Sequence, residues 1–566
     1  MTPLHSDPHL LVLRRTAAEV LAYTMQRLFP QLQCVGGGST NTGFFYDFVL
    51  TQPLTQDALG WLETQLRTLI KENLEIRSLN IMRENAYALF MHHHQPLLAE
   101  KALKECRNII SLVQINDFYG LTAAPHAQTT IELEFIKLLN IEQITSTIDQ
   151  ETILVTRIEG TVFADMRSLK QFVKAAEKLK KWDHRQLGTE LNLFSFSEKM
   201  GMVESFWHPK GVKLKNWLKD LYFKSDFVKR TEKIISPLIV KIPVSSPPSL
   251  FPPTSLENSR YYLSETRLNQ HLEFLKAQLL QTHCVNNRLN EFYQTYRYHE
   301  VTQLCGLFCS YAYESDLTTI ICLEEQVLEE LIYFLQFIKQ LVKIFDFEDH
   351  WYVLNSNLKK ANTKQSIKPI SRLEEALQQL QIDYTNQEIS GLQDACIEMR
   401  LVDTLGREWT SSVISLRKQA HSDPQSKKTM VLFASVFCSL ERWIGLLIEH
   451  YHGEFPVWLA PEQVRILTVG EQNVIYAKAV YASCLQKGLR VQLDDSAVKL
   501  GQKVHQAEIE KIPYVLIIGD QERIKQMVTV RPFAKKDKHL KLKLDEFLEK
   551  LRLESINFKL GVNENA

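Results

Sequence analysis

Leu500-Gly-Gln-Lys-Val-His-Gln-Ala-Glu-Ile-Glu-Lys-Ile-Pro-Tyr-Val-Leu-Ile-Ile-Gly-Asp520 combines a helical segment with the apolar strand that follows it. Two further apolar strands precede it, Arg465-Ile-Leu-Thr-Val469 and Leu489-Arg-Val-Gln-Leu493, and turn residues bound each of them. Strands that alternate with helices in this way are typical of a small α/β sheet. The pattern begins at about residue 456, so we expect the last domain to start there.

The length of the chain excludes a single domain. It has 566 residues, and one hydrophobic core rarely serves more than about 250 to 300, so three or four domains are expected. Lys and Arg together number 66, and so do Asp and Glu, which gives a net charge of zero. A neutral chain has no general affinity for nucleic acid. We therefore expect no DNA partner, and any RNA contact must come from a local basic patch.

Neither a membrane segment nor a secretion signal is visible. No apolar run of about 18 residues occurs, and Met1-Thr-Pro-Leu-His-Ser-Asp7 has no basic stretch followed by an apolar one. We expect a cytoplasmic protein without membrane contact. The nine cysteines lack paired spacing and fit reduced, mostly buried thiols. Only Cys305, Cys309 and Cys322 lie close enough in sequence to suggest a metal site, and zinc would still need a fourth ligand.

The first 155 residues alternate helical and strand-like segments. Thr16–Phe29 has apolar residues at helical spacing, and Pro30 ends that helix. The glycines Gly36-Gly37-Gly38 predict a loop that leads to the aromatic strand Gly43–Phe48. A charged segment with Ala and Leu residues, Met166–Arg185, predicts a helix that connects the first domain to the second.

Several strings of residues resemble the threonyl-tRNA synthetase family, and they occur in the family's order across nearly the whole chain. Chance similarity would not preserve that order. The strings are Arg27-Leu-Phe-Pro30, Gly43-Phe-Phe-Tyr-Asp-Phe48, Arg157-Ile-Glu-Gly-Thr-Val-Phe-Ala-Asp165, Asp183-His-Arg-Gln-Leu-Gly188, Phe206-Trp-His-Pro-Lys-Gly211, Leu405-Gly-Arg-Glu-Trp409, Ser439-Leu-Glu-Arg442 and Phe455-Pro-Val-Trp-Leu-Ala-Pro461.

The resemblance implies an α+β multidomain protein. We expect a degenerate editing-like α+β domain over residues 1–155 and a connecting helix over 156–190. A class II synthetase catalytic domain, built on an antiparallel sheet, is expected over 191–455, and an anticodon-binding α/β domain over 456–566. The ubiquitin-like domain that commonly precedes the editing domain is expected to be absent.

The resemblance also locates a zinc site whose ligands are missing. Family members hold zinc through one cysteine and two histidines, and the metal grips threonine. Those three positions fall on Leu268, Thr319 and Phe433 in this sequence. Zinc needs thiolate, imidazole or carboxylate donors, which leucine and phenylalanine lack. We therefore expect no zinc.

Other positions that face threonine or ATP in the family differ as well. A pocket that loses its hydrogen-bonding groups loses discrimination of roughly 10⁴-fold or more, so threonine recognition is expected to be lost. The differing positions are Leu317, Gln393, Thr410, Val413, Ser415 and Arg417.

An arginine pair remains where class II synthetases clamp the ATP phosphates. The resemblance puts Arg297 and Arg442 at those positions, and Tyr313 where adenine would stack. A guanidinium fork matches phosphate oxygens, so residual binding of ATP with Mg²⁺ is one interpretation. Two nearby family residues are replaced, by His299 and Cys309. The alternative is that Arg442 is kept because it fixes the packing of its helix on the sheet.

The editing pocket of the family is degraded in the same way. Its two helical histidines fall on Arg15 and Glu19, and a later cysteine and histidine fall on Thr122 and His126. One remaining histidine cannot make a hydrolytic site. Arg15 and Glu19, four residues apart on a helix, are instead expected to form a surface ion pair worth about 0.3 kcal/mol.

The last domain carries a run of basic residues that could contact RNA phosphates. The alternative is a solvated charged face, the usual meaning of such a run, and Asp494-Asp495 weakens the basic character nearby. We favour RNA contact by analogy of fold. The candidate RNA-binding residues are Lys503, Lys511, Arg531, Lys535 and Lys536, with Lys538, Lys541 and Lys543 farther along.

Two function classes follow. The first is a synthetase-like pseudoenzyme that binds tRNA as a regulator, scaffold or ligand. It is expected to be a homodimer, because the apolar segment Leu218–Ile235 and Pro237 resemble the class II dimer region. The second is an ATP-dependent ligase, a threonine–tRNA ligase or an adenylating enzyme. Its pocket, lined by Leu268, Thr319 and Phe433, would favour an apolar substrate.

Overall fold

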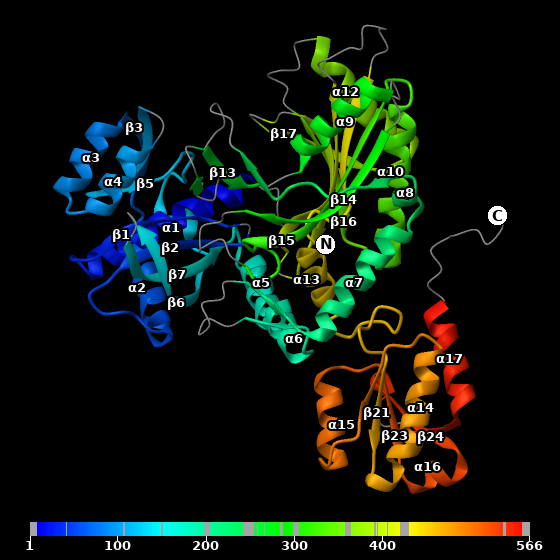
Figure 1. Cartoon of the computed structure of the whole chain (residues 1–566). Coiled ribbons are helices and arrows are strands. Elements are labelled where there is room, and N and C mark those ends of the chain that lie inside the picture. Colours follow the sequence, from blue (N-terminus) through cyan, green and yellow to red (C-terminus); the bar gives the residue numbers. More distant parts are fainter. Residues whose placement is uncertain are drawn as a thin grey trace. The chain divides into compact units, whose positions relative to one another are not determined.

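The chain forms two compact units, residues 1–180 with 405–407, and residues 181–404 with 408–566. A computed structural model defines them (Figure 1). The expected boundaries at residues 155, 190 and 455 stay predictions. The structure describes residues 8–40, 42–105, 108–148, 151–196, 204–241, 254–256, 259–264, 267–282, 287–297, 305–356, 364–389, 392, 394–404, 406–418, 429–535 and 539–556.

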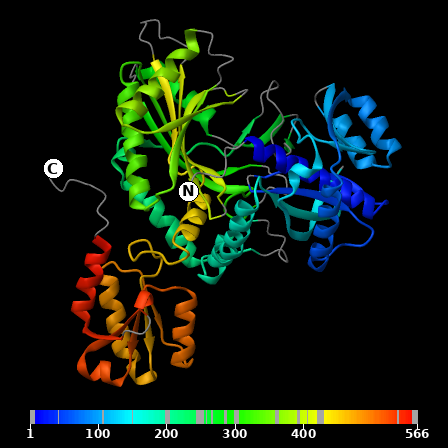
Figure 2. The same cartoon turned by 180° about the vertical axis from the view of Figure 1, so that it is seen from behind.

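The first unit is built on two antiparallel sheets (Figure 2). Its helices are α1 (Pro8–Leu28), α2 (Leu59–Lys71), α3 (Arg83–His92), α4 (Pro96–Lys104) and α5 (Met166–Leu179). Its strands are β1 (Gln33–Ser39), β2 (Phe44–Val49), β3 (Ile76–Met82), β4 (Ile109–Ile115), β5 (Phe118–Leu121), β6 (Ile136–Ile148) and β7 (Glu151–Val162). One sheet has the order β1-β2-β7-β6 and the other β3-β4-β5. Ala17, Val20 and Leu21 of α1 are buried, as their helical spacing predicts.

The three glycines expected in a loop lie inside strand β1, so that expectation was wrong. Residues 36–38 pair with residues 45–47 of β2. A Cβ atom on Gly37 would lie 2.2 Å from Cδ2 of Tyr46, which is closer than atoms can approach. The glycine therefore lets β1 cross the buried Tyr46 ring, a contact that local sequence does not reveal.

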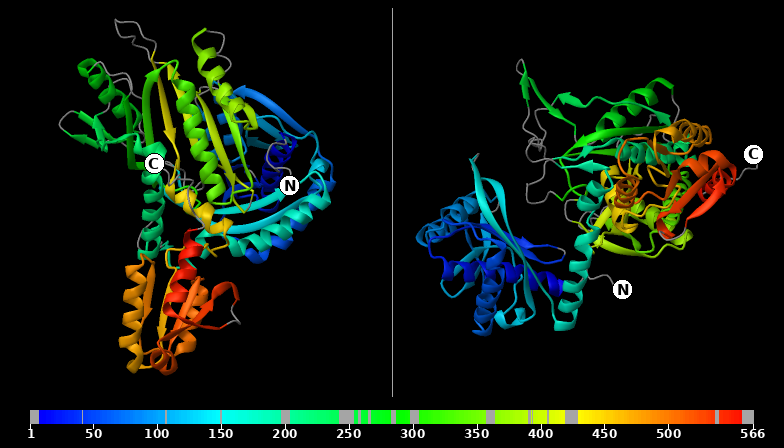
Figure 3. Two further views of the ribbon diagram at one scale, coloured as in Figure 1. Left: turned by 90° about the vertical axis from the view of Figure 1, so that its right-hand side faces the viewer. Right: turned by 90° about the horizontal axis from the view of Figure 1, so that it is seen from below.

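An eight-stranded sheet forms the centre of the second unit (Figure 3). Its strands are β10 (Glu232–Lys233), β14 (Asn287–Tyr296), β15 (Ala312–Leu323), β20 (Thr429–Ser435), β19 (Glu408–Lys418), β18 (Ala395–Val402), β16 (His350–Ser356) and β17 (Tyr384–Glu388), in spatial order. Every neighbouring pair is antiparallel except the two outermost pairs. This arrangement confirms the α+β fold with an antiparallel-rich sheet.

Helices cover both faces of this sheet. They are α6 (His184–Glu190), α7 (Pro209–Lys224), α8 (Asp226–Lys229), α9 (Leu268–Thr282), α10 (Val327–Ile344), α12 (Lys364–Gln379) and α13 (Leu440–His450). Short strands accompany them: β8 (Phe194–Ser195), β9 (Phe206–Trp207), β11 (Ile239–Lys241), β12 (Thr254–Leu256) and β13 (Ser259–Leu263). Residues of α10 and α12 pack in the main core with Ile320 and Leu432, whereas Leu275 of α9 packs with Ile321 and Phe433. Because side chains alternate along a strand, α9 covers the opposite face.

The C-terminal part of the second unit has a five-stranded sheet in the order β22-β21-β23-β24-β25. The strands are β21 (Val464–Thr468), β22 (Val491–Asp494), β23 (Tyr514–Ile518), β24 (Met527–Pro532) and β25 (Leu540–Lys543). The helices are α14 (Val474–Gln486), α15 (Leu500–Ile509), α16 (Asp520–Lys525) and α17 (Leu544–Ile556). Strands β22, β21 and β23 are parallel and β24 and β25 antiparallel to their neighbours, so the expected α/β sheet is confirmed.

A buried network of four charges joins α7 to this C-terminal sheet. The Lys210 ammonium pairs with Glu462 at 2.6 Å and with Glu510. Arg465 pairs with the same two carboxylates, at 2.7 Å and 2.6 Å. None of the four side chains is more than 8% exposed. Two acids therefore balance two bases out of contact with water.

Candidate functional site

The three positions expected to have lost zinc ligands lie together on the α9 face of the large sheet. Thr319 of β15 stands opposite Phe433 of β20 in the strand register. Leu268 begins α9 and packs against the small apolar cluster that holds Phe433 and Leu317. These three residues are far apart in the sequence but lie close together in the structure, as the resemblance predicts for residues of one site.

A chain of hydrogen bonds occupies the same place. Nδ1 of His271 lies 2.9 Å from the Thr319 hydroxyl, and Nε2 lies 3.1 Å from a carboxylate oxygen of Glu291. Glu291 also accepts from the backbone N–H of Ser236 at 2.9 Å and from its hydroxyl at 2.6 Å. His271, Thr319 and Glu291 are all buried. The imidazole thus uses both nitrogens within the protein.

The electrostatics of Glu291 fit an ionised acceptor. Burial acts to raise the pKa of its carboxyl, but the hydrogen bonds from His271 and Ser236 outweigh burial, so the pKa lies below its ordinary value. A carboxylate that accepts several hydrogen bonds holds its donors in fixed positions. Glu291 therefore anchors His271, and through it Thr319, against α9.

The rest of the site is lined by hydrocarbon and one engaged cation. Leu317, 8% exposed, and Phe433 belong to one apolar cluster. The Arg417 guanidinium lies 5.4 Å from the centre of the Phe433 ring and forms an ion pair with Asp394 at 2.5 Å. No thiolate is present among these residues, and the single imidazole is already bonded. This donor set does not fit zinc.

A second group of side chains has its donor atoms close enough together to hold a metal, but these atoms are already hydrogen-bonded within the protein. Among the described residues, Asp183, His184 and Glu449 are the one group whose ligand atoms converge. Nδ1 of His184 lies 2.7 Å from Glu449, and its Nε2 accepts the backbone N–H of Leu307 at 3.0 Å. Glu449 also accepts from Thr404. These bonds tie α6, α13 and the turn at Leu307 together, which is a structural role.

The three residues expected to bind nucleotide come together beside that turn. Nε of Arg442 donates to the Phe308 carbonyl and Nη1 to the Thr410 carbonyl, each at 3.1 Å. Its guanidinium also lies 5.0 Å from the centre of the Trp409 ring. Arg297 and Tyr313 interact with it electrostatically, and burial lowers the pKa of Arg442. Arg297 is exposed.

This geometry is compatible with both interpretations of Arg442. Its bonds to two carbonyls hold a loop and a strand end in place, which is the packing role. The exposed Arg297 beside it adds a second cation within electrostatic range, which is what phosphate binding needs. His299 and Gln393, two further positions that the resemblance singles out, lie outside the described residues.

The positions that the resemblance assigns to an editing pocket lie in the first unit, and one expectation about them was wrong. Glu19 is 1% exposed and does not form a surface ion pair with Arg15. Arg15 instead donates to the carbonyls of Ala123, at 3.1 Å, and Pro125, at 3.3 Å. Helix α1 is buried on this side against the sheet, so four-residue spacing put Glu19 inside the protein.

His126 faces this region from the loop after β5. Its Nδ1 lies 3.1 Å from the Ser78 hydroxyl. Burial, together with the nearby charge of Arg15, lowers the pKa of His126 to about 4. The imidazole is therefore neutral at physiological pH, and Thr122 beside it has no titrating group.

Burial raises the pKa of Glu19 to about 8, and the charge of Lys101 opposes that rise only in part. Its ordinary value is 4.5, so the folded state binds the proton more tightly than the unfolded state. The resulting stabilisation is full below about pH 4.5 and is lost as the pH rises to about 8. We expect Glu19 to contribute a fall in stability of about 1.4 kcal/mol per pH unit in this window, opposed below about pH 6.5 by His126, and Glu19→Gln to remove the Glu19 contribution.

Urea unfolding of the full chain at about pH 5 and about pH 8 measures this slope. Glu72→Gln is the matched control, because Glu72 is exposed and pairs with Arg27 at the surface. A Glu19→Gln protein with the same pH slope as wild type would contradict the assignment.

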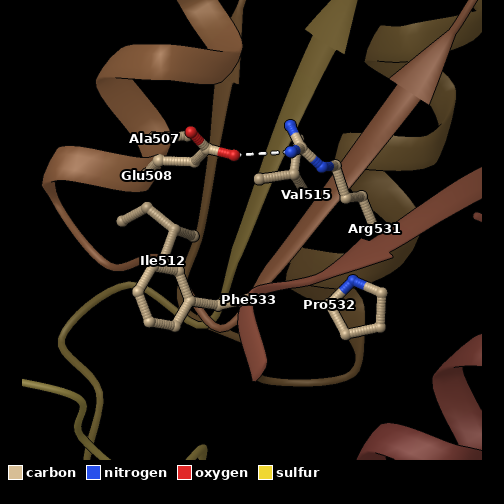
Figure 4. A pocket seen from close by; sticks show the side chains of 7 residues that line it. All are labelled: Ala507, Glu508, Ile512, Val515, Arg531, Pro532 and Phe533. Carbon is tan, nitrogen blue, oxygen red and sulfur yellow. Dashed lines mark hydrogen bonds and ion pairs between the residues drawn. The ribbon is translucent and has the colours of Figure 1, made fainter. Parts of the chain in front are cut away.

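Three of the cations expected to bind RNA have partners within the protein. Lys503 is 3% exposed, and its ammonium lies 3.4 Å from the Asp494 carboxylate. Lys511 donates to the His452 carbonyl. Arg531 pairs with Glu508 across a small surface depression that Ile512 and Phe533 also line (Figure 4). The side chains of Lys535 and Lys536 lie outside the described residues.

Comparison with known proteins agrees with this architecture. The Anticodon binding domain family matches residues 463–554, the five-stranded C-terminal part. A solved structure of the RNA binding domain of threonyl-tRNA synthetase from Cryptosporidium parvum covers 66% of this chain and 98% of its own. Its TM-score is 0.58 at 23% identity, which shows a shared fold. The chain therefore has the fold of an aminoacyl-tRNA synthetase with an anticodon-binding domain.

Curated relatives identify the family. The threonine–tRNA ligase of Clostridioides difficile is 31% identical over 96% of this chain and 88% of its own length. That of Lawsonia intracellularis is 29% identical over 93% and 85%. The chain belongs to the threonyl-tRNA synthetase family. Within the described residues, every helix is too short or too polar to span a bilayer.

Proposed function

We propose that this chain is a tRNA-binding pseudoenzyme of its family, one that does not attach threonine and acts as a regulator or tRNA ligand. The observation that carries the proposal is the cluster of Leu268, Thr319 and Phe433, with the Thr319 hydroxyl bonded to His271. The His271 imidazole and the Glu291 carboxylate, the groups there that could ligate a metal or bind threonine, are bonded to each other. The buried bonds of His271 also leave no nitrogen for a substrate.

The anticodon-binding domain supports the tRNA part of the proposal. Because Lys503 and Lys511 are turned toward internal partners, we assign the phosphate contacts to the exposed lysines of β25, Lys541 and Lys543, of which Lys541 also lies 3.8 Å from Glu522 at the surface. Each phosphate that a lysine neutralises releases counterions, so the affinity for tRNA falls as salt rises. The relatives are named for a reaction on tRNA, which agrees with this partner.

The test is ATP–pyrophosphate exchange with every proteinogenic amino acid, together with tRNA binding at two salt concentrations. We expect no exchange above a protein-free control, and tRNA binding that weakens with salt. In Lys541→Ala/Lys543→Ala, the plot of log affinity against log salt concentration should become less steep, by the equivalent of up to about two phosphate contacts. Lys229→Ala, a change at an exposed lysine of α8, is the control. Exchange with threonine would refute the pseudoenzyme.

A second candidate is an ATP-dependent ligase, and the clustering of Arg297, Tyr313 and Arg442 favours it. The two arginines would hold the phosphates of Mg²⁺-bound ATP, and Tyr313 would stack on the adenine. The site beside them is lined by Leu268, Thr319 and Phe433, so its acid substrate would be apolar. Exchange with one such acid and not with threonine would establish this ligase.

We also propose a homodimer in the cytoplasm. The seven described cysteines are all free, which agrees with a reducing compartment. Ile235, at the end of the segment expected at the dimer contact, is 96% exposed, and Ile239, two residues after Pro237, is 61% exposed. Together these two isoleucines add exposed apolar surface at the expected contact.

Ile235→Asp is therefore expected to shift the protein from dimer to monomer in sedimentation velocity at micromolar concentration, because a carboxylate would be buried without a partner. Ile475→Asp is the matched control, since Ile475 is 84% exposed but lies on α14 of the C-terminal part. A monomeric wild type, or a dimer that withstands Ile235→Asp, would disprove this contact.

A further inference from the structure

The described cysteines that are not buried gather around Arg442. Cys305, Cys309 and Cys438 are partly exposed, whereas the other four described cysteines are buried. Cys309 and Cys438 both interact electrostatically with the Arg442 guanidinium, and Cys305 interacts with Cys309. Three accessible thiols in one cationic neighbourhood are a group that the proposed function does not use.

Two of these thiols stand at the ends of one tight turn. The backbone N–H of Cys305 donates to the Cys309 carbonyl at 3.1 Å, and that of Phe308 donates to the Cys305 carbonyl at 3.1 Å. Gly306 closes the turn with a φ of +57°. This bond joins the backbones of Cys305 and Cys309 directly across the turn. Disulfides most often span about 5.5 to 6 Å between Cα atoms, so the backbone already suits a bridge.

The turn is held in this shape from both sides. The Phe308 carbonyl accepts from Arg442, and the Leu307 N–H donates to the buried His184. Both bonds come from residues outside the turn, so its ends stay close whatever the state of the thiols. A bridge between Cys305 and Cys309 therefore needs rotation of two side chains and no movement of the chain.

We propose that Cys305 and Cys309 form a reversible disulfide, which makes this turn a redox modification site beside Arg442. In a reducing compartment such a pair rests as two thiols and is oxidised transiently, as redox-sensing pairs are. The bridge would fix the turn whose Phe308 carbonyl holds Arg442. The proposal does not depend on whether the chain activates an amino acid.

The oxidant is a low-molecular-weight disulfide such as glutathione disulfide. The Cys305 thiolate attacks one of its sulfurs, the S–S bond breaks, and the first glutathione leaves and takes up a proton. Cys309, after giving up its own proton, attacks the mixed disulfide and releases the second glutathione. Two thiols of the protein and one external disulfide thus become one internal disulfide and two external thiols.

The charges around Cys309 influence the second step. Burial raises the pKa of the Cys309 thiol, and the Arg442 and Arg297 guanidinium groups oppose that rise only in part. Cys438 has its pKa raised to about 12 by burial, so it stays a thiol and does not compete. Cys309 is favoured over Cys438 as the partner of Cys305 because its backbone is joined to that of Cys305 across the turn.

The test uses the native full-length protein in buffers of increasing glutathione disulfide, quenched with acid, alkylated and mapped by mass spectrometry. We expect one peptide linkage, between Cys305 and Cys309, and loss of alkylation at both, fully reversed by reduced glutathione. In Cys305→Ser the linkage is lost and Cys309 is alkylated or carries glutathione. In the control Cys438→Ser the linkage forms as in wild type.

Two results would overturn the proposal. One is that Cys305 and Cys309 both remain alkylatable at oxidant concentrations that add glutathione to Cys438. The other is a stable glutathione adduct on Cys305 that Cys309 never displaces. Because the linkage is mapped in wild type, the proposal is testable even if a serine variant folds poorly.

Discussion

Lys210→Met is expected to destabilise the second unit by about 3 to 5 kcal/mol. The change leaves two buried carboxylates with one buried cation, whereas the wild type has two of each. Glu462 and Glu510 would then share only the guanidinium of Arg465. Methionine has nearly the length of lysine and fills the same space, so the loss measures charge and not packing. The measurement is urea unfolding followed by tryptophan fluorescence, since Trp217 and Trp458 contact each other near this junction, with ring centres 5.3 Å apart.

The control is Lys229→Met, which removes an ammonium from the exposed pair with Asp226 on α8. Its expected effect is within about 0.5 kcal/mol, because exposed ion pairs contribute little. If both variants unfold at the same urea concentration, the network does not stabilise the junction.

Acid should act on the same network. Burial tends to raise the pKa of Glu510, but its bonds to Arg465 and Lys210 lower it from 4.5 to about 2. Its stabilisation is therefore present above about pH 4.5 and is lost as the pH falls to about 2. Lys210→Met should weaken this acid dependence, which repeating the unfolding at low pH would show.

Wild-type protein is expected to retain no zinc after gel filtration, whereas Leu268→Cys/Thr319→His/Phe433→His should retain close to one equivalent. The three positions already lie together, so the change supplies one thiolate and two imidazoles to one place. Structural zinc binds peptides of this donor type with about 10 to 16 kcal/mol at neutral pH, far above what gel filtration removes. Metal content is measured by elemental analysis.

Leu268→Cys alone is the control, because one donor cannot hold the ion, and it should elute without metal. Stoichiometric zinc in wild type would show that the site has been wrongly located. A triple variant that melts like wild type and yet retains no zinc would show that the three side chains do not converge.

Local pattern was enough to predict much of the fold. The strands around Tyr514–Ile518 were found because apolar runs and turn residues are properties of adjacent positions. The strand at Gly36–Ser39 was missed because glycine is needed there to leave room for the Tyr46 side chain, which lies on the next strand. The buried position of Glu19 was missed for the same reason, since helical spacing gives a face but not what covers it.

The sequence predicted where the candidate site lies but not the contacts within it. The positions of Leu268, Thr319 and Phe433 came from the resemblance, and the structure brings them together. The bonds of His271 with Thr319 and Glu291 join residues 48 and 20 positions apart, which spacing cannot reveal. Likewise, Arg531 was included in the basic run because its partner Glu508 lies 23 positions earlier and the run does not reveal that contact.

The phenyl ring of Phe433 has a pharmacological consequence. A threonine mimic that binds through a metal ion needs that ion at this depth, and here it would meet an aromatic ring capped by Arg417. On the proposed function, such a compound is expected to leave the tRNA binding of this chain unchanged.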